Sequence, residues 1–522
     1  MKLNMTLFRD SGIISGDRHL SLDALAERSR RCASGLASLA VGQGDRVALL
    51  LRNDFPFFEA TQGAALLGAS TVPLNWHLTP ADLAYILKDS GARVLIVHAD
   101  MFPEAMRAVV AAAGVPVIVA TTPPEILQAY RLASNGAVST GDLEWEAWLM
   151  GFAPWQAAAV PIVGPMFYTS GTTGTPKGVQ RAGNVPAEVA MAAQRRTLAA
   201  YGLAVAADAK PVRAVMTGPL YHSAPNAYGM NVVRTGGLLV LQPRFDAADL
   251  LAQIAQHRIT HLHMVPTMFV RLLALADEVR TRHDLSSLIS VVHGAAPCPP
   301  EVKRQMIAWW GPVIGEYYAM TETGIITSSS SEQWLQHPGT VGCAALGVKL
   351  LITDDDGHPQ SAGAVGEICI RSETTDFVSY HGAEAKTNSL RRDGYLRTGD
   401  IGYLTADGFL FISDRLSDMV ISGGVNIYPA EIEAALLLLA GVRDAAVFGI
   451  PDDEMGERVV AVVERGDSEI TEASLKSQLR GTLASYKLPR EIAFDIPMPR
   501  EDSGKIKKRL LREQWLLARA GT

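Results

Sequence analysis

The sequence predicts an α/β protein with a large N-terminal domain of two doubly wound α/β subdomains and a small β-barrel, followed by a small mobile α+β domain. Three observations predict it. Buried-strand runs alternate with helical segments as far as residue 319, short strands with Gly and Asp turns begin near Gly339, and a charged run at 414–418 precedes a final mixed segment. A chain of 522 residues also exceeds one hydrophobic core.

The first subdomain begins with a clear helix. Residues 21–40 open with Ser-Leu-Asp-Ala-Leu-Ala-Glu and stop before Gly42, and residues 46–51 (RVALLL) form an apolar run of buried-strand length. Further helices are expected at 55–67 and 78–89, and strands at 70–74, 92–97 and 117–120. Such alternation favours right-handed βαβ units around a mostly parallel sheet.

The second subdomain repeats the pattern. Helices are expected at 186–201, 246–257 and 266–276, and strands at 214–217, 237–241, 259–265, 289–293 and 313–319. Asp246 is a candidate N-cap. Ala295 and Thr321 follow strand ends, where open α/β sheets bind ligands.

Beyond Gly339, short strands at 348–353, 367–371 and 394–410 indicate a small antiparallel barrel or sheet. A helix at 429–440, strands at 442–450 and 457–464, a helix at 471–483 and a basic tail then indicate a small α+β domain. We therefore divide the chain into an N-terminal domain (1–413), a hinge (414–418) and a C-terminal lid domain (419–522).

Composition narrows the function. A net charge of −7 argues against nucleic acid as the partner, and the four cysteines form no CxxC pair, so neither a disulfide framework nor a zinc site is indicated. Residues 1–10 lack an apolar secretion core, and prolines break the apolar stretch 147–168. We expect a cytoplasmic protein without a membrane span.

The most informative stretch is residues 167–179, FYTSGTTGTPKGV. Its glycines let backbone NH groups face an anion, its hydroxyls donate, and Lys177 adds a positive charge, which suits a triphosphate. It is not the kinase-type GxxxxGK[ST] loop, because Pro176 precedes the lysine and Gly178 follows it. A flexible surface turn is the alternative.

Five motifs extend this signal along nearly the whole chain. They are YTSGTTGTPKGV (168–179), YYAMTETG (317–324), YLRTGD (395–400), DRLSDMVISGGVNIYPAEIE (414–433) and PREDSGKIKKRLLR (499–512). The sequence thereby resembles the adenylate-forming superfamily, and most of all its stand-alone AMP-forming acyl-CoA synthetases. The resemblance implies that a carboxylate attacks the α-phosphorus of ATP, with Mg²⁺, and that the thiol of coenzyme A then takes the acyl group and releases AMP.

The resemblance also implies roles for individual residues. The β- and γ-phosphates would lie on the phosphate loop, made by Thr169, Ser170, Gly171, Thr172, Thr173, Gly174 and Lys177. Thr321 would contact the α-phosphate and Glu322 would hold Mg²⁺. A helix-capping pair is the alternative for these two residues.

The nucleoside would be held by a second set. Asp400 and Arg415 would bind the ribose, and Tyr318 would stack on adenine. The other residues implied around the nucleotide are Gly294, Ala295, Ala296, Glu316 and Ile412. A turn aspartate and a buried core tyrosine are the alternatives for Asp400 and Tyr318.

Lys505 is the residue expected to catalyse the first step, by neutralising the acid carboxylate and the α-phosphate together. Its neighbours Lys507, Lys508 and Arg509 read as a solvated basic face. Because Lys505 lies in the small domain, that domain must close. In the family it then rotates, bringing the counterparts of Ser422, Gly423 and Gly424 to line the channel for the thiol arm.

Other residues concern the acid. His222 matches the family position that gates the carboxylate end of the acyl pocket, with a structural histidine as the alternative, whereas His261 and His263 suggest sheet packing rather than a metal pair. An apolar pocket with some polar lining is suggested by Val215, Tyr228, Met230, Met264, Val265, His293 and Met320. It suits medium-chain, aryl or polycyclic acids.

Two departures from the family pattern and two rival functions accompany this reading. Ser417 replaces the usual hinge Asp or Lys, and Ala319 stands where Gly is common, which favours shorter, bulky or aromatic acids. The rivals are a ligase that loads a carrier protein and a catalytically degenerate acyl- or nucleotide-binding protein. The expected partners are the acid, ATP and CoA, and the chain possibly forms a homodimer.

Overall fold

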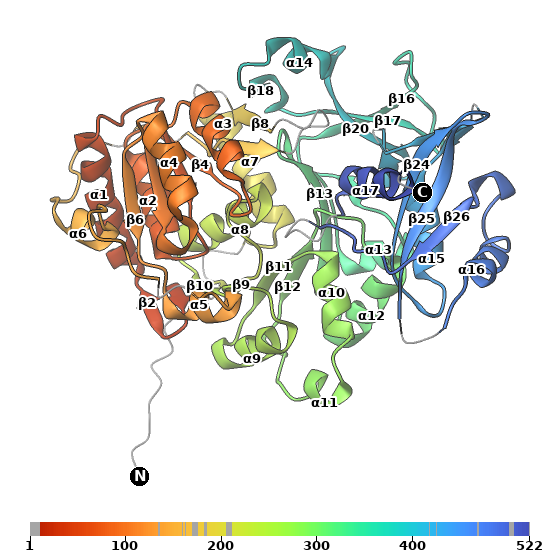
Figure 1. The fold of residues 1–522 in the computed structure, drawn as a ribbon, viewed down its shortest axis with the longest axis horizontal. Coiled ribbons are helices and arrows are strands. Elements are labelled where there is room, and N and C mark those ends of the chain that lie inside the picture. The colour runs from red at the N-terminus through yellow and green to blue at the C-terminus, as the bar shows by residue number, and fades with distance from the viewer. Residues whose placement is uncertain are drawn as a thin grey trace.

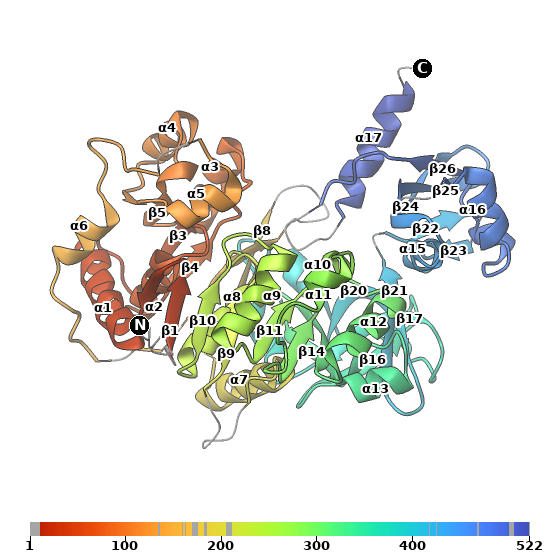
Figure 2. The ribbon, with the colours of Figure 1, turned by 90° about the horizontal axis from the view of Figure 1, so that it is seen from below.

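The computed structural model comprises two α/β subdomains and a C-terminal α+β unit (Figure 1). It describes residues 11–133, 136–158, 160–161, 163–169, 176–181, 185–204, 211–416, 418–423, 425–466, 469–500 and 506–520. Figure 2 shows the C-terminal elements from α15 onward gathered on one side, away from the helices of the first subdomain.

The first subdomain is a parallel sheet covered on both faces. Its strand order is β4-β3-β5-β6, from β3 (Arg46–Leu50), β4 (Ser70–Pro73), β5 (Val94–His98) and β6 (Val117–Ala120). The helices are α1 (Leu22–Ser38), α2 (Phe55–Leu66), α3 (Pro80–Ser90), α4 (Glu104–Ala113), α5 (Pro124–Tyr130) and α6 (Trp145–Met150). Val47 and Leu49 pack with α1 and α2, whereas Ala48 and Leu50 pack with α3 and α4. This two-sided burial explains the continuous apolar run of β3.

A larger sheet of 14 strands carries the second subdomain. Its parallel part contains β9 (Arg213–Met216), β10 (Leu238–Leu241), β11 (His261–Met264), β12 (Ser290–His293) and β13 (Ile314–Met320), and it ends at β1 (Gly12–Ser15) and β2 (Arg18–Leu20). The helices are α7 (Ala187–Ala200), α8 (Ser223–Arg234), α9 (Ala247–His257), α10 (Pro266–Leu273), α11 (Asp277–Arg280), α12 (Pro300–Trp310) and α13 (Ser331–Gln336). Most predicted helices and strands of both subdomains recur within a few residues of their expected ends.

The strands predicted as a small barrel instead extend this same sheet. Beyond β13 the order runs β14 (Gly324–Ser329), β15 (Gly342–Ala344), β21 (Phe409–Arg415), β20 (Tyr395–Leu404), β17 (Gly366–Arg371) and β16 (Lys349–Thr353), with β19 (Arg391–Arg392) beside β20. All these pairs are antiparallel. Among the described strands, these antiparallel strands form an open extension of the sheet, here called the antiparallel arm. They do not close into a barrel, because β15 pairs with β14 on the side of the parallel strands and with β21 on the other side.

A separate hairpin sheet holds the phosphate loop. It contains β7 (Phe167–Thr169), β8 (Lys177–Arg181) and β18 (Val378–Tyr380), and α14 (Glu384–Ser389) follows β18. The pairing of β18 with β8 joins segments about 200 residues apart, since Val378 pairs with Arg181. The sequence contained no signal for that pairing.

The C-terminal unit is a five-stranded sheet with helices on both faces. It comprises β22 (Val420–Ser422), β23 (Val425–Ile427), β24 (Val442–Asp452), β25 (Gly456–Arg465), β26 (Glu491–Phe494), α15 (Pro429–Leu437), α16 (Glu472–Leu479) and α17 (Lys508–Ala520). The predicted basic tail is the helix α17, which packs Leu511 and Trp515 against the sheet. Lys508 is correspondingly not part of a solvated face, because its Nζ lies 2.8 Å from Glu433 Oε1.

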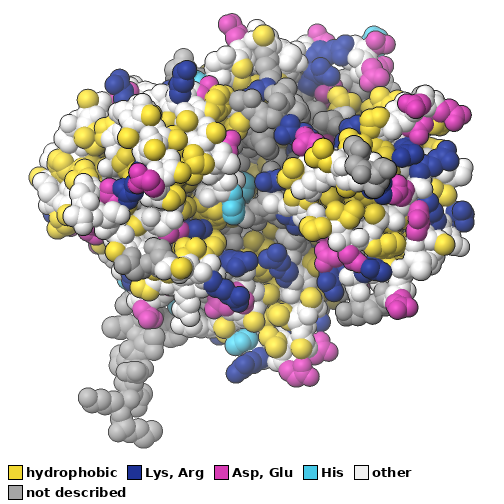
Figure 3. All heavy atoms as spheres, in the orientation of Figure 1, with side chains coloured by type: hydrophobic (Ala, Val, Ile, Leu, Met, Phe, Trp, Pro, Cys, Tyr) yellow, Lys and Arg dark blue, Asp and Glu magenta, His cyan; other side chains and the backbone are white. Residues whose placement is uncertain are grey.

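The surface charges and the hydropathy of the helices match the expectations from composition. On the face shown in Figure 3, basic and acidic side chains are interspersed rather than separated into fields. No helix within the described ranges is both long enough and apolar enough to cross a bilayer.

Candidate active site

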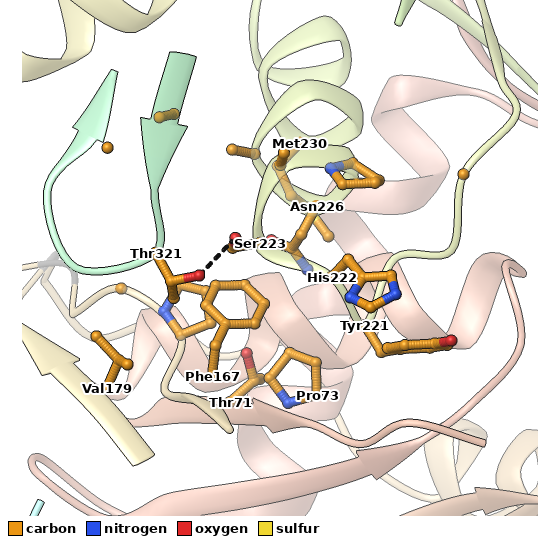
Figure 4. A pocket seen from close by; sticks show the side chains of 18 of the residues that line it. Thr71, Pro73, Phe167, Val179, Tyr221, His222, Ser223, Asn226, Met230 and Thr321 are labelled. Atoms are coloured by element: carbon orange, nitrogen blue, oxygen red, sulfur yellow. Dashed lines mark hydrogen bonds between the residues drawn. The ribbon is translucent and has the colours of Figure 1, made fainter. Parts of the chain in front are cut away.

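A cavity of about 1490 Å³ lies between the first subdomain, the second subdomain and the antiparallel arm. Its walls come from β4, the β7–β8 hairpin, α8, the turn after β13, and β20. In Figure 4, Ser223 and Thr321 face each other within it, close to Phe167, while His222 and Tyr221 lie farther along the same wall. The carboxyl ends of several strands therefore meet at one place, as the topology predicts.

The phosphate-loop hairpin lies at one end of the cavity. Thr169 pairs with Lys177 across the hairpin, and Lys177 lines the cavity. The predicted loop residues Ser170, Gly171, Thr172, Thr173 and Gly174 lie outside the described residues. A Cβ at Gly178 would lie 2.1 Å from Met166 Cε, so a larger residue there would displace the end of the Met166 side chain.

Thr321 and Glu322 lie in the tight turn that joins β13 to β14, and both line the cavity. The helix-capping alternative is wrong, because a strand follows this turn. Thr321 Oγ1 lies 3.3 Å from Ser223 Oγ (Figure 4), and the Tyr380 hydroxyl donates to Glu322 Oε1 at 2.7 Å. Burial, and next the Glu322 carboxylate, raise the pKa of Tyr380, so its hydroxyl keeps its proton and donates.

Asp400 is the centre of a second group. It is a buried residue of β20 rather than a turn aspartate. It accepts a hydrogen bond from the Tyr318 hydroxyl at 2.5 Å, and Arg415 Nε lies 3.2 Å from its other oxygen. Burial and then this carboxylate raise the pKa of Tyr318 well above its usual value. Tyr318 is not among the residues that line the cavity; its hydroxyl holds Asp400.

Three of the residues predicted around adenine follow β12. Ala295 lines the cavity and adopts a left-handed backbone with φ +68°, a conformation that is rare outside glycine. Gly294 instead packs under Tyr317, whose ring carbon Cζ would lie 2.7 Å from a Cβ at this position. Neither Gly294 nor Ala296 is among the lining residues.

Glu316 and Ile412 are not brought to the cavity lining either. Glu316 is buried and lies 2.6 Å from Lys303 Nζ, so its carboxylate belongs to an ion pair between β13 and α12. Ile412 packs against the apolar core of the antiparallel arm. Both residues lie in strands that border the cavity, but the side chain of Glu316 forms the ion pair and that of Ile412 packs in the core.

The histidines divide into two kinds. His222 precedes α8 and lines the cavity, with its ring centroid 4.4 Å from that of Tyr221. His261 Nε2 lies 3.0 Å from the Gly202 carbonyl oxygen and His263 Nε2 lies 2.7 Å from the Tyr317 hydroxyl, which confirms sheet packing. Burial lowers the pKa of His263 to about 4, so it is neutral near pH 7.

The described residues of the predicted 422–424 channel segment do not reach the cavity. Ser422 and Gly423 lie in the β22–β23 hairpin and do not line it. Gly423 has φ +58°, and a Cβ there would lie 2.5 Å from Met455 Cε. Gly424, Ser417 and Lys505 lie outside the described residues.

Comparison with known proteins assigns this architecture. The family model described as AMP-binding enzyme matches residues 5–376, and that of the AMP-binding enzyme C-terminal domain matches residues 431–505. The chain belongs to the AMP-binding enzyme family.

Other members of the family align over nearly the whole length. The chain is 33% identical over 507 residues to long-chain-fatty-acid–CoA ligase FadD13 of Mycobacterium tuberculosis, covering 95% of this chain and 93% of the relative. It is 33% identical over 509 residues to feruloyl-CoA synthase of an Amycolatopsis species, covering 96% and 95%. The ATP-bound structure of MatB from Rhodopseudomonas palustris superposes with a TM-score of 0.83 at 27% identity, covering 98% and 97%.

Among the described residues of this AMP-binding enzyme, no cluster of three or more His, Cys, Asp and Glu side chains is placed to hold a metal. Glu322 is a buried carboxylate of the described lining, and the other one, Asp400, is already held by Tyr318 and Arg415. This donor set fits Mg²⁺, which is commonly held by one or two carboxylates together with substrate phosphates and water.

The sequence did not indicate two contacts of this candidate site, those of Tyr380 and Ser223. Tyr380 lies 58 positions from Glu322, and no spacing rule joins them. Ser223 follows His222 directly in the sequence, and this neighbouring position could have identified it as a residue of the site. Of the predicted pocket residues, Met230, Met264, Val265 and Met320 line the cavity, as does Ala319, whereas Val215, Tyr228 and His293 are fully buried in the core.

Proposed function

We infer that this chain is an AMP-forming acyl-CoA synthetase, which joins a carboxylic acid to coenzyme A through an acyl-adenylate. One observation carries the inference: a single cavity gathers Lys177, the Thr321–Glu322 turn and the Asp400–Arg415 pair beside an apolar wall. Relatives that align over the whole chain are named as CoA ligases of fatty and aryl acids, and the similar MatB structure is ATP-bound, which supports the same reading.

In the first half-reaction a carboxylate oxygen of the acid attacks the α-phosphorus of ATP, and the bond to the bridging oxygen of the pyrophosphate breaks. Lys177 is placed to hold the leaving phosphates, and Thr321 to donate to the α-phosphate. Asp400 is placed to accept from the ribose hydroxyls, with Arg415 holding its second oxygen. Mg²⁺, when bound at Glu322, neutralises phosphate charge.

In the second half-reaction the CoA sulfur attacks the acyl carbonyl carbon, and AMP leaves. We assign Lys505 to the first step and the Ser422–Gly424 segment to the channel for the CoA arm in the second. Residues 419–522 would then act as a lid that turns about 414–418. The packing of this unit around its own two apolar cores supports its moving as a body.

The decisive experiment measures pyrophosphate release from ATP with a panel of medium-chain, aryl and polycyclic acids. Acid-dependent release without CoA, followed by CoA-dependent release of AMP, is expected. If no acid of the panel causes release of pyrophosphate, the assignment is contradicted, even where an acid binds. Turnover with phosphopantetheinylated carrier protein but none with CoA would identify a carrier-protein ligase instead.

The finer assignments have their own tests. Removal of Mg²⁺ with a chelator should stop pyrophosphate release, and its return should restore it. We also propose a homodimer, which light scattering of the purified protein would verify.

A further inference from the structure

The cavity has a second end, far from the predicted site of chemistry. Eight residues of α8 line the cavity, and five of them follow one another at helical spacing: Ser223, Ala227, Met230, Asn231 and Arg234. They form one stripe along the helix. Ser223, which contacts Thr321, marks the reactive end. Asn231 lies eight positions later, about 12 Å along the axis at 1.5 Å per residue.

The far end of this stripe is polar. Asn231 is 4% exposed, and its Oδ1 accepts from Gln194 Nε2 at 2.6 Å and from Arg234 Nη1 at 3.3 Å. Its Nδ2 makes no hydrogen bond to the residues that the structure describes, and this atom is not fully enclosed. An amide donor that a bound acid would cover is costly unless the acid or a water accepts a hydrogen bond from it.

The opposite wall has the same character. Thr61 and Gln62 of α2 line the cavity, and Thr61 Oγ1 is buried without a hydrogen-bond partner in the described structure. Two exposed arginines, Arg30 and Arg234, complete the lining at this end. The carboxylates of the described lining, Glu322 and Asp400, belong to the reactive end, so the charged lining side chains of the far end are Arg30 and Arg234.

Between the ends the wall is apolar, with Met230 and Ala227 on α8 and Ala65 and Leu66 on α2. A plain alkyl tail would fill this section but would leave the donors of the far end unpaired. We propose that the far end is a subsite for an oxygen acceptor carried by the acid substrate, a carboxylate or a hydroxyl oxygen roughly 12 Å from the carboxylate that reacts. This proposal rests on the acyl-CoA synthetase assignment and specifies its substrate class.

Matched acids of equal length test the proposal. For chains of eight to fourteen carbons, kcat/KM of acid-dependent pyrophosphate release is measured for the saturated acid, the ω-hydroxy acid and the α,ω-dicarboxylic acid. At the optimal length, kcat/KM for an oxygenated acid should exceed kcat/KM for the saturated acid by about tenfold, as expected for one buried hydrogen bond to a charged or strongly polar group. A larger gain for the dicarboxylate than for the hydroxy acid identifies an anion site, and the reverse identifies a neutral one.

Two variants locate the effect. Asn231→Asp keeps the acceptor for Gln194 and Arg234 but removes the free donor, so the ratio of oxygenated to saturated kcat/KM should fall toward one. Arg234→Gln should reduce the dicarboxylate ratio most. Gln305→Leu, an exposed change on α12, is the control and should leave the ratio unaltered.

Calorimetry of the same acids without ATP separates the two hypotheses. Preferential binding of oxygenated acids without pyrophosphate release would defeat the synthetase assignment alone. Equal or better use of the saturated acids, or an unchanged ratio in Asn231→Asp, would overturn the subsite.

Discussion

At the scale of single residues, seven of the predicted site residues line the cavity, but their immediate partners came from elsewhere in the chain. Thr321, Glu322, Asp400 and Arg415 were found from motifs because a motif fixes residue type at a known place. Tyr380 was not, because only the fold brings it within 2.7 Å of Glu322.

Tyr380 therefore allows a sharp prediction. Tyr380→Phe keeps the ring and removes one hydrogen bond to a buried carboxylate, an interaction worth about 1.5–3 kcal/mol. We expect the rate of pyrophosphate release to fall by roughly tenfold or more, with a higher Mg²⁺ concentration needed for half-maximal rate. Tyr403→Phe, at a ring that stacks on Phe411 outside the cavity lining, is the matched control. Equal Mg²⁺ dependence in both variants would remove Tyr380 from the site.

His263 predicts how stability depends on pH. Its pKa is about 4 in the folded protein because of burial, against about 6.5 in an unfolded chain. Between these values the unfolded state binds more protons, so stability is full above pH 6.5 and falls as pH falls toward 4. The contribution of His263 between pH 7 and pH 5 is about 2 kcal/mol.

The measurement is the urea-unfolding midpoint at pH 7 and pH 5. His263→Gln should reduce the loss of stability between the two values, whereas His358→Gln, on an exposed surface side chain, should not. If His263→Gln shows the same pH dependence as the unmodified protein, the buried neutral histidine is not responsible for it.

At the scale of elements, helix starts were the most predictable feature because capping is local. Ser21, Asp246 and Thr471 each accept a backbone hydrogen bond at the start of a helix, at 3.2, 2.8 and 3.2 Å. The pairing of β18 with β8 and the fusion of the predicted barrel strands with the main sheet are long-range, and no local pattern specifies them.

The segment between β9 and α8 shows how the fold positions a site loop. Asn53, buried at the end of β3, donates to the Gly218 carbonyl and accepts from the Leu220 NH, both at 2.9 Å. Asn226 donates to the Leu220 carbonyl at 2.9 Å. Asn53 thus holds the backbone just before His222 across the boundary between subdomains, and Asn226 holds it from α8.

Asn53→Ala should loosen this loop. Leaving a buried NH and a buried carbonyl unpaired costs about 1–3 kcal/mol for each group, so the urea midpoint should fall. Because the loop leads into the acyl wall, KM for the acid should rise more than KM for ATP. Asn388→Ala, at an exposed position in α14, should change neither value. A rise in both KM values to the same extent would show a general loss of folding instead.

At the scale of the whole molecule, the small domain is docked on the large one through the hinge. Asp414, the residue before the end of β21, accepts a hydrogen bond from the Ala430 NH at the start of α15 at 2.8 Å. Arg415, its neighbour, holds Asp400 of the large domain. The two domains are thus joined within two residues, and a rotation about 414–418 has to act between these contacts.

That rotation gives the last prediction. If Lys505 serves only the adenylation step, Lys505→Ala should abolish pyrophosphate release from acid and ATP, because the repulsion between the carboxylate and the α-phosphate is no longer neutralised. The same variant should still convert a supplied acyl-adenylate to acyl-CoA, since the second step would use the domain in its other orientation. Lys507→Ala, an exposed lysine two positions along, should retain both steps. Both half-reactions are followed separately, by pyrophosphate release and by thioester formation, and equal loss of the two in Lys505→Ala would exclude a lid that alternates between them.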